Sequence, residues 1–464
     1  MSATDTIAAI ATAVAPGEGS VAIVRISGPR AEAIGRLLFR APGLQTWESH
    51  RVLYGHVVDP ASGERVDEAL LLLMKAPRSF TREDVVELHG HGGLVAVQRV
   101  LELVLAAGAR RAQAGEFSQR AFLNGRLDLT RAEAIGELIT ARSRRAAQLA
   151  MAGIDGGLQR RLTALRQRLL DQLAELEARV DFEEDLPPLD GGAVVAELAA
   201  VRRELEQLVA EARQGELLRE GLRVAIVGRP NVGKSSLLNL LSRRQRAIVT
   251  DLPGTTRDLL ESELVLEGVP LTLLDTAGIR PTDDPVERLG IGRSREALAA
   301  ADAVLLLFDL SAGWTAEDEA LRALVPPGVP LLLVGNKADA ARLPAGLVAA
   351  AGQSGDPPLP PPADLSLCAL SGAGRPALVS ELLRCCGAAP AEGLLVALNA
   401  RQQQLAAAAA SGLGRSLEAA GQQLPWDFWT IDLRAAVRAL GEITGEEVSE
   451  AVLDRVFARF CIGK

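Results

Sequence analysis

The chain has 464 residues, enough for about three domains, and a net charge of −9 from 50 Lys and Arg against 59 Asp and Glu. This charge balance excludes a uniformly basic nucleic-acid-binding surface. Hydrophobic residues make up 48% of the chain and aromatic residues only 3%, a composition that favours helix-rich globular packing. The four cysteines have the spacing of neither a secreted disulfide framework nor a zinc ribbon. With no basic leader and no apolar run of about 18 residues, we expect a cytoplasmic protein that does not cross a membrane.

The first 120 residues alternate short apolar runs with turn signals, which is typical of a small α+β domain. We expect strands over 20–27, 66–74 and 84–88 and a helix over 94–107. His89 and His91 flank Gly90, and we expect them in a turn where hydrogen bonds hold their rings.

Helical periodicity dominates residues 121–215 and returns in residues 385–464. Leucines and valines recur every three or four residues over 158–180 and over 194–208, on either side of the Pro- and Gly-containing stretch 184–192. This pattern predicts two long amphipathic helices that pack as a hairpin. Between the helical stretches, residues 216–384 alternate apolar strands with helices, so we expect an α/β domain inserted into a helical domain.

The sequence Gly228-Arg-Pro-Asn-Val-Gly-Lys-Ser235 matches the phosphate-binding loop G-x-x-x-x-G-K-[ST]. It follows the predicted strand 224–227 and opens a predicted helix, which is the context that this motif requires. The glycines allow the backbone amides to turn toward phosphate, Lys234 can reach the β- and γ-phosphates, and Ser235 can bind Mg²⁺.

Four further motifs follow in the order of a GTPase, and they predict a nucleotide site of the Ras-like P-loop class. Gly254-Thr-Thr-Arg-Asp258 supplies Thr256 as a second Mg²⁺ ligand, and Asp275-Thr-Ala-Gly278 follows a predicted strand. Asn336-Lys-Ala-Asp339 supplies a carboxylate that can select guanine, and Cys368-Ala-Leu370 supplies the Ala369 amide for guanine O6. The candidate GTP-binding residues are Asn231, Val232, Gly233, Lys234, Ser235, Ser236, Thr250, Asp251, Leu252, Pro253, Gly254, Thr255, Thr256, Asp275, Thr276, Ala277, Gly278, Asn336, Lys337, Asp339, Cys368 and Ala369.

The residue that orients water in many GTPases is missing, because Ile279 rather than Gln follows the motif 275–278. Glu287 is the best-placed carboxylate beyond it, although spacing alone favours a solvated residue at the start of a helix. Arg280 and Lys234 complete the candidate catalytic residues. Asn231 can help to hold a monovalent cation that supplies positive charge beside the phosphates.

The chain resembles the bacterial MnmE (TrmE) family of tRNA-modification GTPases. The resemblance covers essentially the whole chain and is carried by motifs outside the GTPase signature. These are Val24-Arg-Ile-Ser-Gly28, Glu83-Asp-Val-Val-Glu-Leu88, His89-Gly-His-Gly-Gly93, Gly115-Glu-Phe-Ser118, Arg120-Ala-Phe-Leu-Asn-Gly125 and the C-terminal Cys461-Ile-Gly-Lys464.

The resemblance implies four segments and a shared activity. The segments are an N-terminal folate-binding and dimerisation domain over 1–120, a helical domain over 121–215 and 385–464, and a G domain over 216–384. The activity is GTP hydrolysis that supports addition of an aminomethyl or carboxymethylaminomethyl group to carbon 5 of the tRNA wobble uridine. A tetrahydrofolate, in its 5-formyl or 5,10-methylene form, donates the one-carbon unit, and the FAD-containing flavoprotein MnmG is the partner.

The resemblance also assigns residues. Arg25, Glu87, Arg126 and Lys464 match folate-contacting positions, and Glu287 matches a water-orienting carboxylate. The potassium shell matches Asn231, Thr250, Leu252 and Thr255. The implied assembly is a homodimer whose G domains approach each other across potassium.

Two other functions fit the GTPase motifs: a ribosome-assembly GTPase acting as a binding switch, and a folate enzyme with a regulatory G domain. Ribosome-assembly GTPases lack an N-terminal folate-type domain. A folate enzyme with a regulatory G domain would turn over folate without RNA or a flavoprotein. A basic stretch over 142–168 can be a tRNA-binding stripe or, more simply, a solvated helical face.

Overall fold

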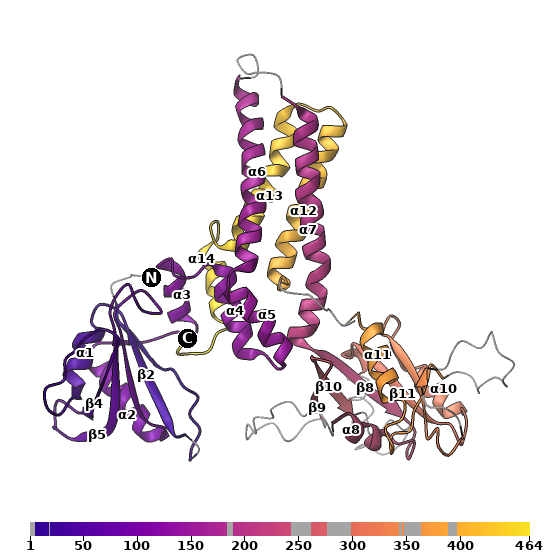
Figure 1. Ribbon diagram of the computed structural model, residues 1–464, viewed down its shortest axis with the longest axis horizontal. Helices are drawn as coiled ribbons and strands as arrows, with labels where there is room; N and C mark the ends of the chain where they lie inside the picture. The colour runs from indigo at the N-terminus through magenta and orange to yellow at the C-terminus, as the bar shows by residue number, and fades with distance from the viewer. Residues whose placement is uncertain are drawn as a thin grey trace. The chain divides into compact units, whose positions relative to one another are not determined.

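The computed structural model describes residues 5–17, 19–182, 189–242, 261–275, 298–342, 346–347, 363–387 and 397–464 (Figure 1). The chain forms two compact units. One comprises Met1–Gly136, Gly153–Arg202 and Ala408–Lys464, and the other comprises Glu137–Ala152 and Arg203–Ala407. In the described part of the chain, no helix carries an apolar stretch of membrane-spanning length.

The N-terminal domain is a seven-stranded sheet with the strand order β3-β4-β5-β6-β2-β1-β7. Its strands are β1 (Ile7–Ile10), β2 (Val21–Ser27), β3 (Phe39–Arg40), β4 (Arg51–Val58), β5 (Arg65–Met74), β6 (Val85–His91) and β7 (Arg110–Arg111). All neighbours are antiparallel except β1 and β7. Helices α1 (Ala31–Leu38) and α2 (Leu94–Ala106) bury one face of this sheet, because alternate residues of each strand point toward them.

The strands and helix predicted in this domain are confirmed as β2, β5, β6 and α2. The expectation that His89 and His91 lie in a turn is wrong, since β6 continues to His91 and pairs with β2 as far as Val21. Gly90 makes the continuation possible. A Cβ at this position would lie 2.3 Å from Asp67 Oδ2, and that carboxylate accepts the His91 amide hydrogen at 2.8 Å.

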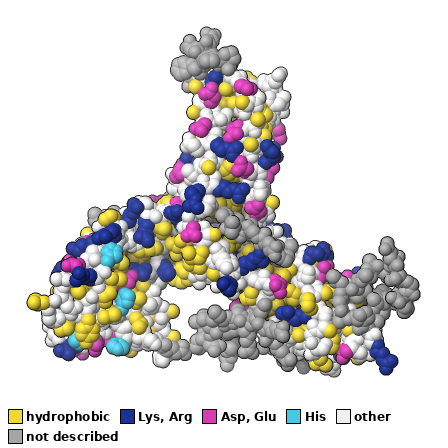
Figure 2. Space-filling view, in the orientation of Figure 1, with side chains coloured by type: hydrophobic (Ala, Val, Ile, Leu, Met, Phe, Trp, Pro, Cys, Tyr) yellow, Lys and Arg dark blue, Asp and Glu magenta, His cyan; other side chains and the backbone are white. Residues whose placement is uncertain are grey.

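On the other face of the N-terminal sheet, Phe117 of helix α3 (Glu116–Leu123) packs against Ile7 and Ala9 of β1, whereas β4 and β5 carry exposed apolar side chains. Val52, Tyr54 and Leu70 are 58%, 47% and 44% exposed on this face. They lie opposite Leu72, Leu70 and His89 of the neighbouring strands. Figure 2 shows hydrophobic and histidine side chains side by side on this domain. We call this surface, defined by Val52, Tyr54, Leu70, Leu72 and His89, the open sheet face.

A network of ion pairs joins helix α3 (Glu116–Leu123) to Asp5, which precedes β1, and to Arg110 of β7. The nearly buried guanidinium of Arg120 lies 2.6 Å from Asp5 and 3.1 Å from both Glu83 and Glu116. Arg110 pairs with the same Asp5 and Glu116. Burial would raise the pKa values of Asp5 and Glu116, but hydrogen bonds from the arginines outweigh it and hold both below their ordinary values.

This network predicts acid-sensitive stability of the N-terminal domain. Because the folded-state pKa values are lowered, the unfolded chain binds more protons in acid. The stabilisation is therefore complete above the ordinary values of 3.8 for Asp5 and 4.5 for Glu116, and is lost as the pH falls below them. Arg120→Met should lower the free energy of unfolding by about 3 kcal/mol at pH 7 and make its fall with acid shallower. Urea unfolding from pH 3 to 7 measures the free energy of unfolding and its dependence on pH. If this free energy fell equally steeply with acid in the variant and the wild type, the role given to the network would be contradicted.

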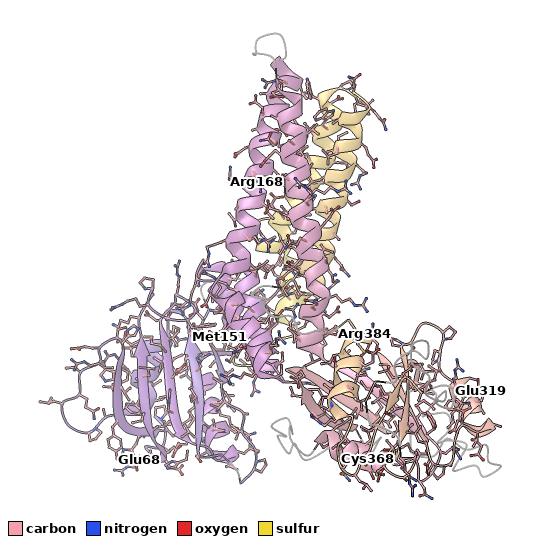
Figure 3. All side chains as sticks on the ribbon, turned by 45° about the vertical axis from the view of Figure 1, so that its right-hand side comes forward. Glu68, Met151, Arg168, Glu319, Cys368 and Arg384 are labelled. Carbon is pink, nitrogen blue, oxygen red and sulfur yellow. The ribbon has the colours of Figure 1, made fainter. Side chains whose placement is uncertain are left out.

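The helical domain is built from α4 (Leu129–Thr140), α5 (Arg144–Ile154), α6 (Gly157–Phe182), α7 (Gly191–Glu220), α12 (Ala400–Gly421), α13 (Trp426–Thr444) and α14 (Glu450–Phe457). Both apolar repeats are buried as predicted except Val180, which is 48% exposed near the end of α6, and α13 packs closely against α6. Arg168 of α6 (Figure 3) pairs with Glu197 of α7 at 2.5 Å, and Arg166 pairs with Glu446 and Glu447. With Arg142, which pairs with Glu263 at 3.0 Å, carboxylates thus neutralise at least three arginines of the basic stretch 142–168.

The second unit contains a sheet with the strand order β13-β14-β12-β11-β8-β10-β9. Its strands are β8 (Leu222–Gly228), β9 (Glu261–Leu266), β10 (Val269–Asp275), β11 (Ala303–Asp309), β12 (Leu331–Asn336), β13 (Gly346–Leu347) and β14 (Leu365–Ser366). Helices α8 (Lys234–Ser242), α10 (Ala316–Arg322) and α11 (Arg375–Cys385) accompany it. Strands β8, β10, β11, β12 and β14 are parallel, which confirms the predicted α/β domain.

The topology of this sheet places a ligand site at the end of β8. Strand β10 lies on one side of β8, and β11, the next strand along the chain, lies on the other side. The strand order therefore reverses at β8. Ligands of such sheets bind at the carboxyl ends of the strands beside this switch point. The predicted phosphate loop begins at this point, with Gly228.

Candidate functional site

The phosphate loop, residues 228–235, connects β8 to α8 and requires glycine at position 233. Gly233 has φ +103°, and a Cβ there would lie 2.2 Å from Asn336 Nδ2. The absent side chain leaves the cradle in which backbone amides can approach a phosphate. The loop therefore fits the triphosphate of a nucleotide.

Lys234 and Ser235 begin α8, where the first-turn N–H groups lack partners within the helix. Lys234 Nζ donates hydrogen bonds to the carbonyl oxygens of Gly228 at 2.6 Å and Arg229 at 2.9 Å. This places the ammonium within the loop, as the motif predicts for a lysine that binds phosphate oxygens.

Asn336, at the end of β12, ties the phosphate loop to the Cys368–Ala369 segment. Its Nδ2 donates to the carbonyl of Val232 at 2.7 Å, and its Oδ1 accepts from the Ala369 amide at 3.0 Å. The buried Asn336 is thus a brace between two loops. The Ala369 amide that we expected to contact guanine O6 is already bonded to this side chain, so contact with a base would share or replace that hydrogen bond.

The rest of the predicted guanine site lies beside Asn336. Lys337 Nζ is 2.6 Å from Asp309 Oδ2, at the end of β11. Burial would raise the pKa of Asp309, but the hydrogen bonds from Lys337 and Ser311 outweigh it and lower that pKa. Asp339 is exposed, as required of a carboxylate that meets a base, and Cys368 is buried.

Several predicted residues lie outside the described residues and stay predictions. They are Thr250, Asp251, Leu252, Pro253, Gly254, Thr255, Thr256, Thr276, Ala277, Gly278, Arg280 and Glu287. Among the described residues, no group of three His, Cys, Asp or Glu side chains forms a metal site. Of the two predicted Mg²⁺ ligands, Ser235 lies at the start of α8, and Thr256 lies outside the described residues.

A second candidate site lies on the open sheet face, where β2 and β6 are paired. Arg25 stands opposite Glu87, and its Nε donates to Glu87 Oε1 at 2.8 Å. His89 Nε2 lies 3.0 Å from Glu87 Oε2, so both carboxylate oxygens have a partner. Burial would raise the pKa of Glu87, but the His89 hydrogen bond and the charge of Arg25 outweigh it and lower that pKa. Glu87 is thus an anchored anion.

Aromatic side chains place Arg126 beside the same region. The Arg25 guanidinium lies 5.6 Å from the centre of the Phe117 ring, and that of Arg126 lies 5.5 Å from the Phe80 ring. Phe80 packs on the apolar cluster that contains Phe117. The two arginines therefore flank one apolar cluster, a combination that suits a flat, partly charged ligand.

The C-terminal residues reach this second site through the backbone. Ile462 forms an antiparallel bridge with Ala114, and the Gly463 carbonyl accepts a hydrogen bond from Arg25 Nη1 at 3.1 Å. Lys464 is consequently the immediate neighbour of an Arg25 contact, although 438 residues separate Gly463 from Arg25. The structure brings together Arg25, Glu87 and the C-terminal backbone.

Sequence reasoning missed His89 as a partner of Glu87 and Phe117 as a contact of Arg25. The signal for His89 was present in the two-residue spacing from Glu87, which places both side chains on the same face of a strand. The contact of Phe117 depends on packing between α3 and β2 and has no such local signal.

Two family models match the chain. "MnmE helical domain" matches residues 129–461, and "GTP-binding protein TrmE N-terminus" matches residues 6–126. The tRNA modification GTPase MnmE of Synechococcus sp. (strain CC9605) is 69% identical and covers 100% of both chains. Those of Synechococcus sp. (strain RCC307) and Prochlorococcus marinus (strain MIT 9313) are 70% and 68% identical over 99% of this chain and 98% of each relative. A crystal structure of Aquifex aeolicus Era bound to GDP and AlF4⁻ is 24% identical and covers 41% of this chain and 66% of that chain, and its TM-score of 0.27 adds nothing to the fold described above.

Proposed function

The chain belongs to the MnmE family of tRNA-modification GTPases, and we propose that it hydrolyses GTP within a complex that modifies the tRNA wobble uridine. The product is uridine carrying an aminomethyl or carboxymethylaminomethyl group at carbon 5. A 5-formyl- or 5,10-methylene-tetrahydrofolate supplies the one-carbon unit, and the FAD of the flavoprotein MnmG supplies redox chemistry. We place the protein in the cytoplasm.

The proposed GTP site uses the phosphate loop for the phosphates and Asp339 for guanine. Asn336 supports both, because it bonds Val232 of the loop and Ala369 beside the base position. Ser235 and Thr256 would hold Mg²⁺, and Asn231, Thr250, Leu252 and Thr255 would hold K⁺. Bound cations supply charge neutralisation at the phosphates.

In this proposal Glu287 orients the attacking water, and Arg280 lies in the same catalytic segment. The absence of Gln at position 279 supports Glu287, because another side chain must do this work. The rest of the catalytic machinery is the described loop with Lys234.

The proposed folate site is the anchored Glu87 carboxylate with Arg25, Arg126 and Lys464. A carboxylate can accept two hydrogen bonds from the amino and ring N–H groups of a pterin, and arginines attract the carboxylates of its glutamate. The C-terminal Lys464 is next to Gly463, which Arg25 already contacts. The observation that carries the folate proposal is that β2, β6 and the C-terminal residues meet at one site with both charged and apolar side chains.

The open sheet face supports a homodimer. Val52, Tyr54 and Leu70 expose apolar area beside Arg25 and Glu87, and such a surface is typical of a protein interface. We propose that a second copy covers it and that MnmG then completes a heterotetramer. The proposed domains are 1–120, 121–215, 216–384 and 385–464, the first for folate and the third for GTP.

Hydrolysis in matched potassium and sodium buffers tests the proposed GTPase mechanism. We expect faster turnover in potassium, and Glu287→Ala should lower kcat on the order of 100-fold with little change in KM, because Glu287 acts on water rather than on GTP binding. Glu317→Ala, which changes an exposed carboxylate of α10, is the matched control and should behave as the wild type. Equal rates in the two salts would overturn the potassium role, and an active Glu287→Ala would overturn that of the carboxylate.

A further inference from the structure

The side chain of Arg229, in the phosphate loop, forms an ion pair with the buried carboxylate of Asp318 in helix α10. Its Nε lies 2.8 Å from Asp318 Oδ1. Asp318 is 0% exposed, whereas the Arg229 side chain is 20% exposed. No part of the nucleotide motif requires arginine at this position of G-x-x-x-x-G-K-[ST], so the contact needs an explanation of its own.

Asp318 is held in one orientation by the start of α10. Its Oδ2 accepts hydrogen bonds from the Thr315 amide at 3.0 Å and the Thr315 hydroxyl at 2.8 Å, which completes a capping box. Both carboxylate oxygens are therefore used. Removal of Arg229 would leave a buried charge without its cation, an arrangement that proteins avoid.

The pair fixes the part of the loop on which Lys234 rests. Lys234 Nζ bonds the carbonyls of Gly228 and Arg229, so the position of the Arg229 backbone also sets the position of the ammonium. Two residues further, Asn231 has φ +61°. Arg229 thus anchors the beginning of the loop, while Asn336 anchors it at Val232.

We propose that Arg229 and Asp318 are positioning residues for GTP binding. Their ion pair holds the first bend of the phosphate loop, so that the loop amides are already placed for the triphosphate when the Lys234 ammonium moves toward it. Without the ion pair, the loop backbone can adopt other conformations. GTP binding must then order the loop, and this cost lowers the affinity.

Arg229 also connects the phosphate loop to the segment that contains Trp314. Arg229 Nη2 lies 3.5 Å from the carbonyl of Gly313, next to Trp314. The Trp314 indole packs edge-on against Phe308, with 5.2 Å between ring centres, and donates to Glu319 of α10 (Figure 3) at 3.1 Å. When GTP draws Lys234 from the two carbonyls, the shift reaches Trp314 through Arg229. The other tryptophans, at 47, 426 and 429, belong to the other unit.

The test compares GTP affinity with folding in the full-length protein. Arg229→Gln is expected to weaken the affinity for a fluorescent GTP analogue on the order of tenfold, since small misplacements of binding groups have effects of this size. It should also remove the GTP-induced change in Trp314 fluorescence, identified as the change that Trp314→Phe abolishes. Arg384→Gln breaks the Arg384–Glu381 pair of α11, in which Arg384 is exposed, and should change neither.

A double variant separates positioning from stability. Arg229→Met with Asp318→Asn removes the ion pair without leaving a buried charge, so its thermal midpoint should return toward the wild-type value. The proposal expects GTP affinity to stay about tenfold weaker and the fluorescence response to stay absent in this folded variant. Recovery of affinity together with the midpoint, or wild-type affinity in Arg229→Gln, overturns the proposal.

Discussion

Gly233→Ala is expected to abolish measurable GTP hydrolysis and to weaken GTP affinity on the order of 100-fold or more. Two costs act together. Alanine at φ +103° carries backbone strain of about 1–3 kcal/mol. In addition, its Cβ would lie 2.2 Å from Asn336 Nδ2, and Asn336 cannot move away without breaking its bonds to Val232 and Ala369.

Gly328 provides a control that distinguishes the effect of backbone strain from that of the steric clash with Asn336. Gly328 has φ +89°, yet a Cβ there would have no heavy atom within 4 Å. Gly328→Ala therefore carries comparable strain without disturbing the nucleotide site. Titration with a fluorescent GTP analogue should show near wild-type affinity for Gly328→Ala and none measurable for Gly233→Ala. Equal affinities would mean that the cradle at residue 233 does not bind phosphate.

Arg25→Gln is expected to weaken binding of 5-formyl-tetrahydrofolate by at least about 30-fold while GTP hydrolysis is retained. The substitution breaks the pair with Glu87 and the contact with the Gly463 carbonyl. Removal of one member of a desolvated charge pair costs about 2–5 kcal/mol of binding free energy, which is the basis of the expected factor. Isothermal titration of the full-length protein measures the affinity.

The control is Arg36→Gln, in the same domain. Arg36 pairs with Glu32 of its own helix α1 and is 48% exposed. Folate affinity should not change. Retained affinity in Arg25→Gln would locate the folate site away from the Arg25–Glu87 pair, whatever the state of the G domain.

The nucleotide site could be predicted from the sequence because its parts are local. The motifs that begin with Gly228, Asp275 and Asn336 start at the ends of β8, β10 and β12, and parallel strands bring their carboxyl ends to one edge. Asn336 shows where this reasoning stops. Its position after β12 was predictable, but its role as a brace between Val232 and Ala369 depends on how two loops meet in space.

The folate candidate could be predicted only in part. The resemblance assigned Arg25, Glu87, Arg126 and Lys464, and strand pairing confirms that Arg25 and Glu87 face each other. Local reasoning placed His89 in a turn, because His89 and His91 flank Gly90. Pairing of β6 with β2 overrode that signal, and no pattern in the sequence shows which strands will pair.

The central claim is that one chain carries two separate sites, for GTP and for folate, and that wobble-uridine modification needs both. Mass spectrometry of tRNA nucleosides tests it most directly, in cells that lack the native gene and carry wild type, Gly233→Ala or Arg25→Gln. We predict full modification with the wild type and loss of it with either variant, each expressed at the wild-type level. Unchanged modification in the deletion strain, in a host that makes this nucleoside and has no second copy of the gene, would contradict the account.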